Sequence, residues 1–174
     1  MIFKKIEEIH WNRIIEIQDE SYREIGTEEL DVLKSKNAAS PDTCFVCVSK
    51  SGVVLGYLLA HPWRGTSPPK LFEPLPNITD CEYLYLHDMA ISPQSKGQGI
   101  GRAAALKLIE VARNKGMNKV MLVAVQGSES FWATIGFQEV KGVSICSSYG
   151  EKAQLMEKVL AVSMGSVYQW GQSR

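Results

Sequence analysis

The sequence lacks both an excess of charge and any long apolar run. Its 174 residues contain 19 lysines and arginines and 19 aspartates and glutamates, so the formal net charge is zero. No overall field then favours nucleic acid or an anionic membrane surface, and we expect neither as a partner. The apolar run 53–60 is far shorter than the ~20 residues that a membrane-spanning helix needs. The first ten residues, MIFKKIEEIH, have no apolar stretch typical of a secretory signal, so we expect a cytoplasmic protein.

Cysteine is scarce, and its positions form no framework. The sequence has 4 cysteines. Cys44 and Cys47 are spaced C-x-x-C, but they lie in a strand-like run, where residues three apart point to opposite faces. Neither Cys81 nor Cys146 belongs to a second such pair. The spacing therefore predicts buried or inert thiols, with no disulfide framework and no metal site.

The sequence also has no internal repeat and no low-complexity segment. With 45% apolar residues, 22% charged residues and a mean hydropathy of −0.09, its composition is typical of a soluble globular protein. The length fits one domain of ordinary size, which we place at 1–160. The tail, 161–174, shows no clear period, so we expect it to be loose or docked on a partner.

Strand and helix patterns alternate along the chain, which predicts an α/β fold with a mixed sheet covered by helices. Apolar side chains from Trp11 to Ile25 follow helical spacing, and the helix is expected to end near Gly26. Thr27 is the expected cap of a second helix. The expected strands are 1–6, 43–49, 53–60, 82–92, 119–125, 137–146 and 155–160, and the expected helices are 11–26, 27–36, 99–115 and 128–135.

The segment between His61 and Asp80 is rich in proline. It holds 5 of the 7 prolines, together with Trp63 and Phe72. A loop of this length in a compact domain is usually functional or disordered, and proline stiffens it. It is either a surface excursion or a lid over a binding site, and its aromatic residues favour the lid.

The most informative segment is 86–102, where a strand enters a glycine-rich turn that opens a helix. Gly97, Gly99 and Gly101 remove side chains that would keep a ligand away, so backbone N–H groups can surround a phosphate. A nucleotide-binding P-loop would need lysine where Arg102 stands, and a dinucleotide fingerprint starting at Gly97 would need glycine there. Neither known loop fits.

A third loop does fit. The residues 94–99, QSKGQG, match the Q/R-x-x-G-x-G/A signature of the GNAT acyltransferase superfamily, which cradles the pyrophosphate of acetyl-CoA. A strand ending in MAISP precedes them, and an amphipathic helix follows. The segment 131–137, FWATIGF, resembles the family's F-Y-x-x-x-G-F segment. The resemblance is strong over 83–137 and extends in element order over 2–160.

The resemblance implies a single-domain, mostly antiparallel sheet with a splayed central strand pair and about four flanking helices. It also implies acetyl-CoA as co-substrate. The pantetheine arm would bond the backbone of 89–91 between the splayed strands, and the pyrophosphate would lie over 96–102. The cofactor-binding residues that it implies are Met89, Ala90, Ile91, Gln94, Lys96, Gly97, Gln98, Gly99, Ile100, Gly101, Arg102, Gln126, Ser128, Phe131 and Trp132.

The sequence departs from the family at one chemical position. Where many members have a tyrosine that can protonate the departing thiolate, this chain has Trp132. An indole N–H is a donor but no useful acid. Ser128 or Ser130 could relay a proton through water, or could cap the short helix.

The strand 82–92 supplies the candidate catalytic residues. Related acyltransferases carry a histidine or glutamate base at positions corresponding to 85 and 87, which implies His87 as the base and Tyr85 as a donor or wall. A strand N–H near Met89 would meet the developing oxyanion. Asp88 is expected to bond backbone N–H groups behind the strand, although a bulge would reverse the faces. Strict alternation would place Tyr83, Tyr85, His87 and Met89 on one face, and Leu84, Leu86, Asp88 and Ala90 on the other.

The resemblance therefore implies an N-acetyltransferase that moves an acetyl group from acetyl-CoA to a primary amine of a small molecule by direct attack. No cysteine adjoins the glycine-rich turn in sequence, which disfavours a covalent acyl-enzyme. Two alternatives stay open: transfer to a protein N-terminus or lysine, and a catalytically silent module that binds acyl-CoA. A homodimer is compatible with the sequence, which does not specify one.

Overall fold

A computed structural model describes residues 1–161. In these residues one seven-stranded sheet has the strand order β1-β2-β3-β4-β5-β7-β6. Neighbouring strands pair antiparallel, except β4 and β5, which pair parallel. The strands are β1 (Ile2–Lys5), β2 (Phe45–Val48), β3 (Val54–Trp63), β4 (Tyr83–Ile91), β5 (Lys119–Ala124), β6 (Gln138–Glu139) and β7 (Gln154–Val159), and the α-helices are α1 (Trp11–Ser21), α2 (Leu30–Ala39), α3 (Ile100–Asn114) and α4 (Glu129–Ile135).

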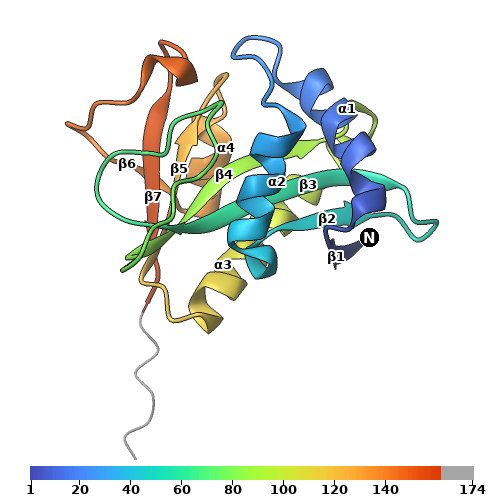
Figure 1. The fold of residues 1–174 in the computed structure, drawn as a ribbon, viewed down its shortest axis with the longest axis horizontal. Helices are drawn as coiled ribbons and strands as arrows, with labels where there is room; N and C mark the ends of the chain where they lie inside the picture. The colour runs from blue at the N-terminus through green and yellow to red at the C-terminus, as the bar shows by residue number, and fades with distance from the viewer. Residues whose placement is uncertain (162–174) are drawn as a thin grey trace, which may run out of the picture.

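Helices cover both faces of the sheet. The helices α1 and α2 lie on one face, and α3 lies behind the sheet in the same view (Figure 1). Alanines of α3, with Leu108 and Ile109, pack with Trp132 and Ile135 of α4 in one core, whereas Ile14 and Ile17 of α1 pack with Leu33 of α2 in another. The predicted mixed, mostly antiparallel sheet with four helices is confirmed.

The parallel pair β4–β5 separates partway along its length. Leu84, Tyr85 and Leu86 pair with 120–122 of β5, and the pairing stops there although β4 continues to Ile91. Because the chain crosses from β4 to β5 through α3, the start of α3 lies near the end of β4 that is free of β5. The predicted splay therefore opens beside the glycine-rich turn.

A bulge in β4 corrects the predicted alternation of its faces. On β3, Leu59 pairs with Asp88 and Ala60 pairs with Leu86, which leaves His87 as an extra residue. An extra residue shifts the side-chain pattern by one. His87 and Asp88 both make their contacts with the α1–α2 side, whereas Met89 packs with the core under α3. The expectation that Asp88 lies behind the strand, and that Met89 shares the face of His87, is therefore wrong.

Several predicted boundaries also differ. Helix α1 ends at Ser21 rather than near Gly26, because the backbone of Tyr22 leaves the helical region at φ −108° and ψ 62°. The N-cap of α2 is Glu29 rather than Thr27. The predicted strand 137–146 is reduced to two residues, and Val140, Val143 and Ile145 beyond it pack as a loop against Tyr83 and Tyr85.

The predicted tail, 161–174, lies outside the described residues from 162 onward. Within 1–161, no helix combines the length and apolar character needed to cross a membrane. The same residues contain no group of three or more histidine, cysteine, aspartate or glutamate side chains that could hold a metal ion.

His61 on β3 makes the stability of the fold sensitive to acid. Burial, followed by the positive field of His87, lowers the pKa of His61 from 6.5 to about 3. Below pH 6.5 the unfolded chain therefore binds a proton at this position that the folded chain does not, so stability falls as the pH falls towards 3. Between pH 7.5 and 5 we expect His61 to cost about 2 kcal/mol of unfolding free energy.

Urea unfolding of the wild type and of His61→Gln at these two pH values measures this cost. Glutamine does not titrate, so the wild type should lose about 2 kcal/mol more than the variant. If the two proteins lose equal unfolding free energy between pH 7.5 and 5, then His61 is protonated in the folded chain at pH 5.

Candidate active site

A pocket of about 240 Å³ occupies the gap between β4 and β5. Its lining includes residues 86–91 of β4, Leu122 and Val123 of β5, and Phe131 and Trp132 of α4. The segment that joins α1 to α2 and the proline-rich loop also contribute, through Ile25, Glu28, Leu71 and Phe72. The structure thus brings the end of β4 and the predicted lid to one cavity.

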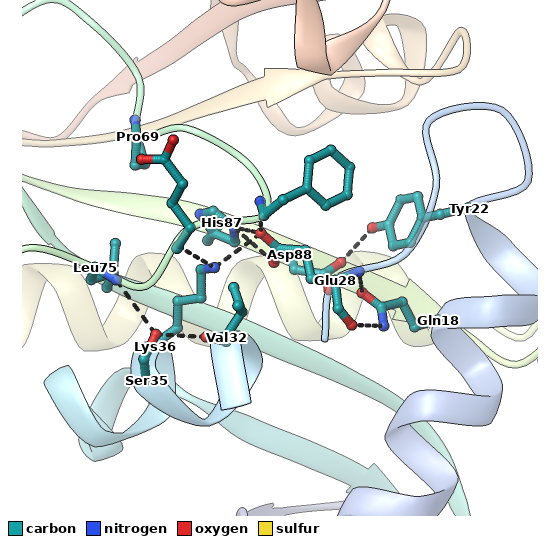
Figure 2. Close-up of polar contacts among 12 residues, drawn as sticks. Gln18, Tyr22, Glu28, Val32, Ser35, Lys36, Pro69, Leu75, His87 and Asp88 are labelled. Carbon is teal, nitrogen blue, oxygen red and sulfur yellow. Dashed lines mark hydrogen bonds and ion pairs between the residues drawn. The ribbon is translucent and has the colours of Figure 1, made fainter. Parts of the chain in front are cut away.

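Within this pocket the side chain of His87 is hydrogen-bonded to that of Glu28. The Nε2 atom of His87 lies 3.1 Å from Oε2 of Glu28, and both side chains are buried (Figure 2). A carboxylate only accepts hydrogen bonds, so Nε2 is the donor of this pair, and in the neutral imidazole the lone pair is on Nδ1. Nδ1 is buried and has no hydrogen-bond partner among the described residues. This pair has the arrangement of a general base that a carboxylate orients.

Glu28 also joins the predicted lid to α2. Its Oε1 accepts a hydrogen bond of 2.7 Å from the backbone N–H of Phe72 and one of 3.0 Å from Lys36, whose side chain is fully buried. Burial alone would raise the pKa of Glu28, but the hydrogen bond and charge of His87, together with Lys36, lower it to about 2. Glu28 therefore stays ionised near neutral pH, where it can hold His87.

Asp88 is bonded to two tyrosine side chains rather than to backbone N–H groups. Tyr22 and Tyr57 each donate a hydrogen bond of 2.6 Å to its carboxylate, and the Tyr22 hydroxyl also lies 2.9 Å from the carbonyl oxygen of Met89. Burial raises the pKa of Asp88, although these two hydrogen bonds oppose the change. The predicted structural role fits, but with different partners on the other face of the strand.

The structure does not bring Tyr85 to the pocket. Its hydroxyl lies 3.2 Å from the hydroxyl of Tyr149, which donates to the carbonyl oxygen of Pro69. Tyr149 lines the pocket and Tyr85 does not. Tyr85 thus contacts Tyr149, a residue of the pocket lining, without lining the pocket itself. The other two implied catalytic residues, His87 and Met89, both line the pocket.

The glycine-rich turn adjoins the pocket, to which it contributes Lys96. Gly97 and Gly99 have φ values of 79° and 75°, and a Cβ added to either would meet no heavy atom within 4 Å. The first helical bond of α3 joins the Ala103 N–H to the Gly99 carbonyl, so the amides of 100–102 have no helical acceptor. Open space and free N–H groups fit a phosphate ligand.

The residues implied for cofactor binding divide into two groups. Some line the pocket directly: Met89, Ala90, Ile91, Lys96, Gln126, Ser128, Phe131 and Trp132. The others lie in the turn and the first turn of α3, beyond the pocket lining: Gln94, Gly97, Gln98, Gly99, Ile100, Gly101 and Arg102.

Two side chains in these groups, those of Gln126 and Arg102, donate hydrogen bonds to backbone carbonyl groups of other elements. Gln126 donates a hydrogen bond of 3.0 Å to the Ser21 carbonyl, which ties the β5–α4 connection to the end of α1. Arg102 donates one of 3.3 Å to the Thr134 carbonyl. The Ser128 hydroxyl makes no capping bond to α4. For Gln126 and Arg102, contact with a cofactor would compete with these hydrogen bonds.

Trp132 is buried, packs against Phe131 and Phe137, and lines the pocket. Because a thiolate leaves readily near neutral pH, loss of the indole N–H should matter little. We expect Trp132→Phe to lower kcat of acetyl transfer less than about tenfold, a change of about 1.4 kcal/mol in the barrier. Steady-state kinetics measure it, with circular dichroism as the check of fold. A hundredfold loss in the folded variant would give the tryptophan a role in the chemistry.

Glu28, Tyr22 and Tyr149 are functional candidates that the sequence does not reveal. Glu28 lies in a connection without periodicity or motif, and 59 positions separate it from His87. Tyr149 lies in a short turn beyond the part of the chain that resembles the family strongly. Only the tertiary fold brings these side chains to the end of β4.

Comparison with known proteins agrees with this architecture. The model of the acetyltransferase (GNAT) family matches residues 11–137. Glucosamine 6-phosphate N-acetyltransferase from Trypanosoma brucei brucei is 33% identical over 54 residues, which are 31% of this chain and 37% of that protein. N-acetyltransferase 8 from Mus musculus is 28% identical over 118 residues, which are 66% of this chain and 47% of that protein.

The chain therefore spans less than half the length of these two relatives. Among solved structures, the GphF GNAT-like decarboxylase in complex with isobutyryl-CoA superposes with a TM-score of 0.75 at 12% identity, covering 91% of this chain and 99% of that one. At this identity the likeness shows the fold. The family match extends over more than half of the chain and includes β4, the glycine-rich turn and α4, so the chain belongs to the GNAT acetyltransferase family.

Proposed function

We propose that this protein transfers an acetyl group from acetyl-CoA to a primary amine of a small molecule by direct attack. The observation that carries the proposal is the His87–Glu28 pair, which lies in one pocket with the splayed end of β4 and with Lys96 of the glycine-rich turn. Both relatives are named as N-acetyltransferases, and GphF was solved with an acyl-CoA bound, which supports an acyl-CoA co-substrate here.

His87 would serve as the proton acceptor. An alkyl amine titrates near 10.4 and is mostly protonated at pH 7, so the reaction must remove a proton before or during attack. With Nε2 donating to Glu28, the neutral imidazole would use its Nδ1 lone pair to take the proton of the amine, once the amine or a water reaches this buried atom. A backbone N–H near Met89 would bond the oxyanion that forms as the amine attacks the thioester carbonyl.

The proline-rich loop favours a small acceptor over a peptide. Its Phe72 N–H bonds Glu28 on one side of the pocket, and its Pro69 carbonyl accepts a hydrogen bond from Tyr149 on the other. The loop thereby bridges the α1–α2 connection and the segment before β7. We expect a loop held at both ends in this way to leave less room for an extended peptide than for a small amine.

Direct transfer agrees with the lining of the pocket. None of the four cysteines belongs to it, and burial raises the pKa of Cys44 to about 12, which makes that thiol a poor nucleophile. The silent acyl-CoA-binding module is the second candidate, because Trp132 replaces the usual acid.

Release of free CoA from acetyl-CoA distinguishes these functions. We expect release that depends on a small primary amine, with peptides bearing free N-termini or lysines being slower acceptors at equal concentration. Faster release with peptides would transfer the function to protein acetylation. Tight acetyl-CoA binding without release for any acceptor would identify the silent module.

A further inference from the structure

We infer that the acceptor amine carries an uncharged apolar or aromatic body, and that Phe72 selects it. This inference rests on the proposed function and concerns the acceptor end of the same pocket. Three connecting segments form that end: the α1–α2 connection, the proline-rich loop and the turn at 147–149.

The side chains of this end make an apolar rim. Ile25 and Leu71 are half-buried, and Phe72 is 43% exposed although it is a large apolar residue that lines the pocket. The ring of Phe72 lies 3.8 Å from the position that a Cβ on Gly26 would occupy, so it reaches across to the α1–α2 connection. The Tyr149 hydroxyl is already bonded to Pro69 and Tyr85, which leaves its ring as its contribution to the lining.

The backbone holds Phe72 in this place at a cost. Its φ is 66°, in the left-handed region that bulky residues rarely adopt, and its N–H donates to Glu28. A strained, exposed aromatic residue fixed at a pocket mouth points to a binding role for the ring.

The charges of this end are unfavourable for an anionic acceptor. Glu28 and Asp88 are acidic, and among residues 1–161 the only lysine or arginine that lines the pocket is Lys96, in the glycine-rich turn. Lys36 is fully buried, pairs with Oε1 of Glu28 and does not line the pocket. A phosphate on the acceptor would therefore find no lysine or arginine at this end that is not already paired with a carboxylate. This lining differs from what a phosphorylated amino sugar, the acceptor in the name of one relative, requires.

Three matched amines test the inference: 2-phenylethylamine, ethanolamine and O-phosphoethanolamine, each with saturating acetyl-CoA. Burial of the phenyl ring should raise kcat/KM for 2-phenylethylamine at least about tenfold above that for ethanolamine. The phosphate should lower kcat/KM for O-phosphoethanolamine at least about tenfold below it.

The variant Phe72→Asn removes the ring, and asparagine tolerates the left-handed backbone. It should reduce the preference for 2-phenylethylamine over ethanolamine, taken as the ratio of the two kcat/KM values, to within about threefold. Val53→Asn, at a turn residue that is 56% exposed and outside the pocket, is the matched control and should keep every preference.

The outcomes separate this inference from the function on which it rests. Faster turnover of O-phosphoethanolamine than of ethanolamine, or an unchanged preference in Phe72→Asn, would overturn the inference and leave acetyl transfer intact. Failure of all three amines to release CoA, with acetyl-CoA bound, would overturn the proposed function itself.

Discussion

Replacing His87 by glutamine is expected to lower kcat of acetyl transfer by about a hundredfold below pH 8, which corresponds to about 2.7 kcal/mol in the barrier. Glutamine can still bond Glu28, whose carboxylate lies 3.1 Å from Nε2, but it offers no basic lone pair to the amine. Part of the loss should be recovered at higher pH, because the free amine then forms without a base. Steady-state kinetics from pH 6 to 9 measure both effects.

The matched control is His10→Gln. His10 is also buried, and its Nδ1 accepts a hydrogen bond from the Glu7 N–H outside the pocket. It should retain wild-type turnover at every pH. Acetyl-CoA affinity of His87→Gln should also match that of the wild type. Full activity of His87→Gln across this pH range, with a collapse in Asp88→Asn of intact fold, would transfer the role of base to Asp88.

The second large effect concerns the glycine-rich turn. Gly99→Val is expected to weaken acetyl-CoA binding at least about thirtyfold, or about 2 kcal/mol. A Cβ at Gly99 would project into space that no heavy atom fills within 4 Å, where the pyrophosphate would approach the free amides of α3. Isothermal titration calorimetry on the folded variant measures the change.

Backbone strain is the competing explanation, and Gly142→Val controls for it. Gly142 has a φ of 77°, close to the 75° of Gly99, and also has no heavy atom within 4 Å of an added Cβ. It lies after β6 and outside the pocket. Both variants should lose similar stability, whereas only Gly99→Val should lose affinity. An unchanged dissociation constant in Gly99→Val would remove the turn from the site.

The sequence predicts the parts of the molecule that local patterns encode. Helix α3 and strands β4 and β5 follow from hydrophobic periodicity within a residue or two, and QSKGQG predicts the glycine-rich turn from the conformations that only glycine adopts readily. The pocket lining then follows in large part from the family resemblance.

The features that decide the chemistry depend on contacts between residues that are far apart in the sequence. The bulge at His87 depends on how β4 pairs with β3, and strict alternation along one strand cannot show it. Glu28 and Tyr149 reach the pocket from connecting segments that tertiary contacts hold in place. The buried Lys36 pairs with Glu28, and the carbonyl oxygen of Pro69 accepts a hydrogen bond from Tyr149. The cap predicted at Thr27 lies at Glu29 instead, and Glu28 before it makes its contact with His87, which is distant in sequence.

The central claim is that this pocket transfers acetyl groups directly to a small primary amine. Mass spectrometry of a reaction with acetyl-CoA carrying a ¹³C-labelled acetyl group and 2-phenylethylamine tests it most directly. We expect labelled N-acetyl-2-phenylethylamine in amounts equal to the free CoA formed, with no labelled protein at any time. Free CoA accompanied by labelled acetate alone, or a labelled acyl-enzyme that forms before the product, would contradict it.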